Sequence, residues 1–262
     1  MLFDLPVLKQ NTAQLDLSGV DFDGFRDRPL SPAALRCLQY MHDVEYHTVC
    51  YLRDLLVTTA HRDHEIASFL TFWVFEEYWH GEAIGQVLAA HDQAADAERV
   101  DPLRRKLARR ESLKPLLHGL GSLVAGKEWL AVHMTWGAVN EWTTQAGYAR
   151  LSAREKHPIL TDLLKRIMRQ EGRHIDFYST HARDALSRSA RAQKLVRFTL
   201  RRLWSPVGAG VMPQAEVDHL IDYLFCGPDG AAAAARIDRQ VDRLPGQDGL
   251  HLLQKVVTAR AA

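Results

Sequence analysis

The feature that most constrains this chain is a Glu-x-x-His tetrapeptide that occurs in two long segments of helical pattern. The copies are Glu77-x-x-His80 and Glu171-x-x-His174. Residues three apart lie on the same face of a helix, so each pair projects a carboxylate and an imidazole in one direction. Each pair can therefore ligate one metal ion, and its glutamate is free to bridge to a second ion.

Helical projection at about 100° per residue places both pairs on the apolar face of their helix. The apolar neighbours are Ile66, Leu70, Trp73, Val74, Ile84 and Leu88 around the first pair, and Leu160, Leu164, Ile167, Met168, Ile175 and Tyr178 around the second. A buried carboxylate is costly unless it is paired or binds a metal. The pattern therefore favours two pairs of buried ligands over two solvated helix faces.

Two other long segments each supply one more glutamate on an apolar face. Glu45 lies among residues such as Leu38, Met41 and Leu52, and Glu141 lies among apolar residues of its own segment. The order along the chain is then Glu, Glu-x-x-His, Glu, Glu-x-x-His. The predicted metal ligands are Glu45, Glu77, His80, Glu141, Glu171 and His174. Four carboxylates and two imidazoles suit a pair of iron or manganese ions.

A third copy of the tetrapeptide, Glu216-x-x-His219, is interpreted differently. Both residues lie on the polar side of the apolar stripe made by the residues around them. We therefore expect this pair at the surface, with no part in metal binding. The direction of Glu76 differs from that of Glu77 by about 100°, so Glu76 is expected at the edge of the bundle.

The helical pattern predicts an all-α fold built on four long helices. These are expected at 31–57, 63–90, 127–150 and 158–186, with shorter helices after Asp101-Pro102 and at 190–203, 213–224 and 231–242. Gly119, Gly121 and Gly126 are expected to interrupt the pattern before the third long helix. The predicted organisation is an N-terminal arm, 1–30, followed by one bundle domain, 31–262, with accessory helices at its C-terminal end.

Composition excludes several other classes of protein. Three scattered cysteines do not make a disulfide framework or a zinc knuckle. The N-terminus shows no secretion signal and no apolar run is long enough for a membrane span, so a cytoplasmic protein is expected. Arginines gather at 103–110 and 188–202, but no groove-reading motif accompanies them, so a solvated face or a docking surface for an acidic partner is favoured over a nucleic-acid surface.

Three segments resemble those of the acyl-carrier-protein desaturases, which are ferritin-like di-iron proteins. Glu77-Tyr78-Trp79-His80-Gly81 is similar to the family's Glu-x-x-His-Gly, and Glu141-Trp142-Thr143-Thr144-Gln145 to its Glu-x-x-Thr segment. Gln170-Glu171-Gly172-Arg173-His174 resembles the Glu-x-Arg-His segment, and Glu45 fits the single glutamate of the first bundle helix. The likeness covers about residues 35 to 185.

The resemblance implies a ferritin-like four-helix bundle that holds two iron ions, with a manganese and iron pair as the other option. It implies an oxidoreductase that desaturates an acyl chain on acyl carrier protein, with dioxygen and electrons from a ferredoxin. A homodimer and a long, apolar substrate pocket are expected. Thr144 would place a hydroxyl where bound oxygen and its protons are handled, although it could equally bond back to its own helix. Gln170 departs from the acidic residue common in the family at that position.

Two alternatives stay open at this stage. A related di-iron hydroxylase or N-oxygenase acting on another substrate would have almost the same ligands. A non-catalytic ferritin-like protein that handles iron or generates a radical would need a storage cage or a tyrosine beside the metals. Tyr148 and Tyr178 face the predicted stripe, but aromatic residues at helical spacing are more often core packing.

Overall fold

The computed structural model describes residues 3–94 and 100–261 and is mainly helical. The elements are α1 (Leu5–Asn11), α2 (Gly24–Asp27), α3 (Pro32–Leu56), the short 3-10 helix η1 (Thr59–Arg62), α4 (His64–Ala89), α5 (Val100–Ala125), α6 (Lys127–Glu155), α7 (Pro158–Arg188), α8 (Ala190–Leu203), α9 (Gln214–Phe225), α10 (Gly227–Asp242) and α11 (Leu252–Ala261). The described ranges contain no β-strand, only one isolated bridge between Ala209 and Met212. The all-α helical bundle with additional short helices is confirmed.

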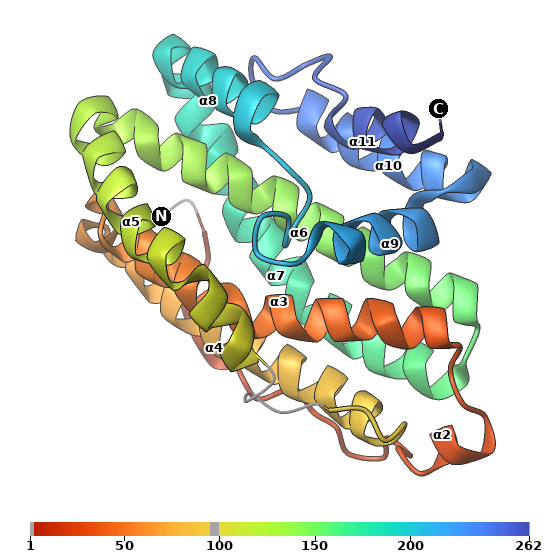
Figure 1. The fold of residues 1–262 in the computed structure, drawn as a ribbon. Helices are drawn as coiled ribbons and strands as arrows, with labels where there is room; N and C mark the ends of the chain where they lie inside the picture. The colour runs from red at the N-terminus through yellow and green to blue at the C-terminus, as the bar shows by residue number, and fades with distance from the viewer. Residues whose placement is uncertain (1–2, 95–99, 262) are drawn as a thin grey trace.

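The bundle consists of α3, α4, α6 and α7 (Figure 1). The most extensive contacts join α6 to α7 and α3 to α4. Helix α5 packs on α3 and α6, while α8 to α11 gather on the side of α6 that faces away from α4. None of the helices in the described ranges is long and apolar enough to cross a membrane.

The long helices begin where their sequence signals predict. At α3, the Ser31 hydroxyl accepts a hydrogen bond from the backbone N–H of Ala34, and proline follows at the first helical position. The Asp63 carboxylate caps α4 in the same manner. The ring of His157 accepts from the backbone N–H of Leu160 at the start of α7, which also opens with proline. These caps fix where the long helices begin.

Helix α5 differs from the expected short helix. It continues past Pro115, Gly119 and Gly121 as one helix and ends at Ala125, before Gly126 with φ +58°. A Cβ at Gly121 would meet the Trp129 ring at 2.7 Å, so this glycine allows close packing of α5 on α6 and does not end the helix. The sequence pattern also gives no sign of α11, which packs on α10. Residues 95–99, which precede α5, lie outside the described residues.

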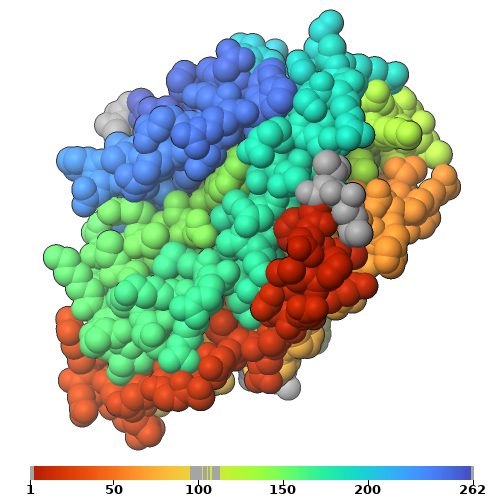
Figure 2. All heavy atoms as spheres, turned by 180° about the vertical axis from the view of Figure 1, so that it is seen from behind, coloured from red at the N-terminus to blue at the C-terminus, as the bar shows by residue number. Residues whose placement is uncertain are grey.

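The N-terminal segment lies against α7, as the view from behind shows (Figure 2). It carries the short helices α1 and α2, which the sequence pattern does not predict. Gln170 Nε2 donates to the carbonyl of Ala13 at 3.1 Å, and Arg166 Nη1 donates to the carbonyls of Asp16 and Ser18 at 2.8 and 3.0 Å. The segment therefore holds polar side chains of α7 in fixed directions.

Candidate metal centre

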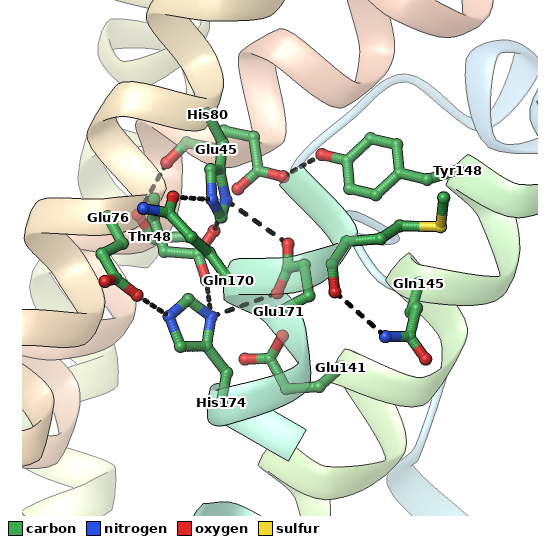
Figure 3. A network of polar contacts seen from close by, with 12 residues as sticks. Glu45, Thr48, Glu76, His80, Glu141, Gln145, Tyr148, Gln170, Glu171 and His174 are labelled. Atoms are coloured by element: carbon green, nitrogen blue, oxygen red, sulfur yellow. Dashed lines mark hydrogen bonds and ion pairs between the residues drawn. The ribbon is translucent and has the colours of Figure 1, made fainter. Parts of the chain in front are cut away.

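All six predicted ligands lie in one buried cluster inside the bundle. Figure 3 labels Glu45, His80, Glu141, Glu171 and His174 of this cluster. The most exposed of them, Glu141, exposes 6% of its surface. Their ligand atoms form two groups, each with all atoms within 4.8 Å of one another. The groups are Glu45, Glu77, His80 and Glu171, and Glu77, Glu141, Glu171 and His174. Helices α3, α4, α6 and α7 all contribute, so the cluster depends on the whole bundle.

Glu77 and Glu171 lie between the two imidazoles and belong to both groups. The Nδ1 atom of His80 is 3.4 Å from Glu77 Oε2 and 3.4 Å from Glu171 Oε1. The Nδ1 atom of His174 is 3.1 Å from Glu77 Oε1 and 3.1 Å from Glu171 Oε2. Each of these carboxylates thus presents one oxygen to each imidazole. This is the arrangement that two bridging ligands require.

The far nitrogen of His174 contacts Glu76, which helical projection of the α4 sequence places at the edge of the bundle. His174 Nε2 lies 2.8 Å from Glu76 Oε2, and Arg173 Nη2 donates to Glu76 Oε1 at 2.5 Å. Glu76 is fully buried, so its expected place at the bundle edge is wrong. The reason is that Arg173 and His174 reach across from α7, which projection along α4 alone cannot show. Such an outer carboxylate fixes the ring so that Nδ1 faces the cluster.

The far nitrogen of His80 contacts a neutral amide instead. His80 Nε2 is 2.9 Å from Gln170 Oε1, and the other end of this amide donates to Ala13. His80 Nδ1 and Glu171 Oε1 are both buried and have no hydrogen-bond partner in the part of the chain that the structure describes. A cation between these atoms would satisfy both, so the residues present fit a metal ion.

The two outer carboxylates are held by aromatic donors. The Tyr148 hydroxyl donates to Glu45 Oε1, and Trp73 Nε1 donates to Glu141 Oε1 at 3.0 Å. Tyr148 and Tyr178 are both completely buried. Of these two tyrosines, Tyr148 alone makes a hydrogen bond to a cluster residue within the described part of the chain, and the sequence pattern gives no sign of that contact. These donors fix the directions in which Glu45 and Glu141 present their oxygens.

Burial and mutual charge divide the cluster into two inner ion pairs and two outer acids. Burial, reinforced by neighbouring carboxylates, raises the pKa of Glu45 and of Glu141 well above the usual value. Burial also opposes ionisation of Glu77 and Glu171. For Glu77 a hydrogen bond with Glu45 and the contacts to both imidazoles outweigh burial and lower the pKa, and for Glu171 the contacts to both imidazoles do so. For His80, the contacts to Glu171 and Glu77 outweigh burial and raise the pKa to about 9.

A cavity of about 240 Å³ lies beside the cluster and is lined by three of its carboxylates, Glu45, Glu77 and Glu141. Aromatic rings and the segment 205–209 also line it, but so do polar side chains such as Asn140 and Asp54. A smaller, mainly apolar cavity of about 40 Å³ shares part of this lining. The larger cavity is therefore not uniformly apolar, unlike the pocket expected for an acyl chain.

Thr144 lines both cavities, one turn after Glu141. In the described residues its hydroxyl makes no hydrogen bond. Its neighbour Thr143 is the threonine that bonds back to the helix, through the carbonyl of Val139 at 2.7 Å. Thr144 thus offers a hydroxyl group at the edge of the site.

The third tetrapeptide lies on α9, outside both groups, as projection predicts. Arg36 Nε donates to Glu216 Oε2 at 2.7 Å, and His219 Nε2 lies 3.1 Å from the carbonyl of Ala33. Both residues join α9 to the start of α3, so their contacts are explained without a metal.

The buried glutamates and histidines of the cluster could hold a metal ion. Carboxylate oxygen and imidazole nitrogen together are the ligands of iron and manganese sites in helix bundles. The chain matches no protein-family model, and neither a curated protein nor a solved structure matches it. The arrangement of its own residues therefore carries the functional argument.

Proposed function

We propose that this protein is a dioxygen-activating oxidoreductase that holds two iron ions in the buried cluster. The observation that carries the proposal is the pair of overlapping ligand groups, which share Glu77 and Glu171. A single ion would need only one group. Two groups with two shared carboxylates are what a pair of bridged ions requires.

The first ion would be held by Glu45 and His80 and the second by Glu141 and His174, with Glu77 and Glu171 between them. Two irons bound there would supply electrons and Lewis-acid positions for the reduction of dioxygen. The aromatic walls of the larger cavity, including Trp73 and Tyr178, would limit access of water. The Thr144 hydroxyl would donate or relay a proton beside Glu141.

Two reactions are candidates. Desaturation of an acyl chain on acyl carrier protein is supported by the resemblance of three helical segments to the desaturases, and it would use a ferredoxin as electron donor. Hydroxylation or N-oxygenation of a more polar substrate is favoured by the polar residues in the lining of the larger cavity, among them Asn140 and Asp54. The metal site would be the same in both.

The metal proposal is tested by anaerobic reconstitution with Fe(II), followed by metal analysis and Mössbauer spectroscopy. The expected result is two irons per chain. Glu171→Ala removes a shared ligand and should lower the content to one iron or none. A wild-type protein that binds no more than one iron would contradict the proposal.

The reaction is tested by adding dioxygen and an electron donor to the loaded protein with a panel of carrier-bound saturated chains and smaller polar compounds. Mass spectrometry then separates the two candidates. Desaturation leaves a product lighter by two hydrogens, and hydroxylation leaves one heavier by one oxygen. If the di-iron protein fails to consume dioxygen, it is not an oxygen-activating enzyme.

A further inference from the structure

The outer face of α8 carries a dense row of positive charge. The helix contains five Lys and Arg residues and no Asp or Glu. Four of these cations are exposed and, with one exposed aromatic residue, follow each other at helical spacing on one face. We call this face the α8 stripe; its members are Arg191, Lys194, Phe198, Arg201 and Arg202.

The four cations of the stripe have no ion-pair partner among the described residues. The fifth cation of the helix, Arg197, behaves differently, because its Nη1 donates to the carbonyls of Gly246 and Asp248 at 3.1 and 2.8 Å. Just before the helix, Arg188 pairs with Asp184 at 2.7 Å. Like charges one turn apart repel each other. The stripe therefore costs stability, and no contact with the described residues explains it.

Two large apolar side chains of α8 are exposed: Phe198 within the stripe and Leu203 at the end of the helix. Phe198 exposes 59% of its surface and Leu203 exposes 63%. The helix already buries an apolar face against the bundle through residues such as Val196 and Leu200. Phe198 and Leu203 are thus not needed for packing. Exposed aromatic and apolar side chains among Arg residues are typical of a protein interface.

The stripe is continuous with the wall of the candidate active site. Helix α8 ends at Leu203, and the residues that follow, from Ser205 to Ala209, line the larger cavity. The Tyr40 hydroxyl donates to the carbonyl of Val207 and ties this segment to α3. Figure 1 shows the segment after α8 running from the end of that helix to the bundle beside α3. A molecule held on α8 would therefore lie next to the cover of the cavity.

We propose that the α8 stripe docks an acidic surface of a partner protein that delivers the substrate or the electrons to the cluster. The delivery role rests on the proposed function, whereas the docking itself does not. Charge complementarity favours an acidic partner. A nucleic-acid surface fits less well, because the chain has a formal net charge of +1 and a pI of about 7.8. A membrane fits less well because the broad apolar face of α8 is turned inward.

The test measures binding of two acidic probes, a holo-acyl carrier protein and a [2Fe–2S] ferredoxin, by fluorescence anisotropy at low and at physiological salt. The charge-reversed variant is Arg201→Glu/Arg202→Glu, and Arg191→Glu/Lys194→Glu repeats the test at the far end of the stripe. Lys165→Glu/Arg169→Glu is the matched control, because these two cations are exposed on α7 and also lack an ion pair among the described residues. Thermal melting shows that each variant is folded.

At least one probe should bind the wild-type protein, and each stripe variant should weaken it by about tenfold or more at low salt. The control should change binding by less than about threefold. Phe198→Ala should weaken binding without changing its salt dependence. The proposal is overturned if neither probe binds, or if the stripe variants bind a probe as tightly as the wild type does. It is also overturned if the control variant loses as much affinity as the stripe variants, or if a DNA duplex binds the stripe more tightly than both proteins.

The metal content of the same samples separates this proposal from the proposed function. Protein that holds two irons but shows no stripe-dependent binding would refute the docking surface alone. Protein that binds a probe through the stripe but holds no iron would refute the proposed function alone.

Discussion

Loading the cluster with metal should release a number of protons that follows from its geometry. In the metal-free protein, burial raises the pKa of Glu45 and of Glu141 well above the usual value and so favours their protonated forms. The contacts to Glu77 and Glu171 raise the pKa of His80 to about 9 and that of His174 well above its usual value. We therefore expect two imidazolium ions and two carboxylic acids, each with one proton that a bound metal ion would displace. Metal ligands must be deprotonated, so two divalent ions displace four protons.

The direction and the size of the change in metal affinity with pH follow from proton linkage. The metal-bound state holds fewer protons, so affinity must rise with pH. With about four protons released per pair of ions near pH 7, the overall binding constant should rise about 10⁴-fold per pH unit. Above pH 9 His80 is already neutral in the metal-free protein, so the number of protons released should fall toward about three.

Titration calorimetry with Mn(II) measures the number of protons released on metal binding. The titration is repeated in buffers of equal pH and different ionisation enthalpy. The slope of the observed enthalpy against the buffer enthalpy gives the protons released. Glu141→Gln removes one of the acids and should lower the count by about one if both ions still bind. A wild-type count below about two would refute this reasoning even if the protein binds two ions.

Three further predictions concern other residues. Replacing Glu216 and His219 by alanine should leave the metal stoichiometry unchanged, and loss of an ion in metal analysis would show that the helical-face argument is wrong. Gly137→Ala should lower the free energy of unfolding by about 1–3 kcal/mol in urea titrations, since the new Cβ would meet the Tyr178 ring at 2.4 Å. The control Gly172→Ala meets nothing within 4 Å and should not destabilise. Burial lowers the pKa of His133 from 6.5 to about 3, so stability should fall as the pH drops below 6.5, and His133→Phe should reduce that loss.

The sequence predicts the residues of the buried cluster because each helix is amphipathic on its own. Glu77 and Glu171 lie among apolar neighbours at helical spacing, which is a local property that projection captures. Glu76 shows the limit of this method. Its burial depends on Arg173 and His174, which belong to another helix and come from a distant part of the chain.

The course of α5 and the cavity wall could not be predicted for related reasons. The low helix propensity of glycine predicts that a helix ends near Gly121. In the structure α5 continues there, because Gly121 lies against Trp129, and only the packed structure shows that contact. The segment 205–209 has no periodic pattern, yet it closes the larger cavity because Tyr40 holds it against α3. Sequence periodicity places the elements, whereas contacts between distant segments decide what lies over the site.

The two imidazoles have different outer hydrogen-bond partners, and this difference would give a metal ion beside each of them different properties. His174 is hydrogen bonded to a carboxylate, Glu76, whereas His80 is hydrogen bonded to the neutral amide of Gln170. A carboxylate makes an imidazole a stronger electron donor than an amide does. The two positions are therefore chemically inequivalent: an ion beside His174 would tolerate the higher oxidation state, and one beside His80 would be the easier to reduce or to exchange.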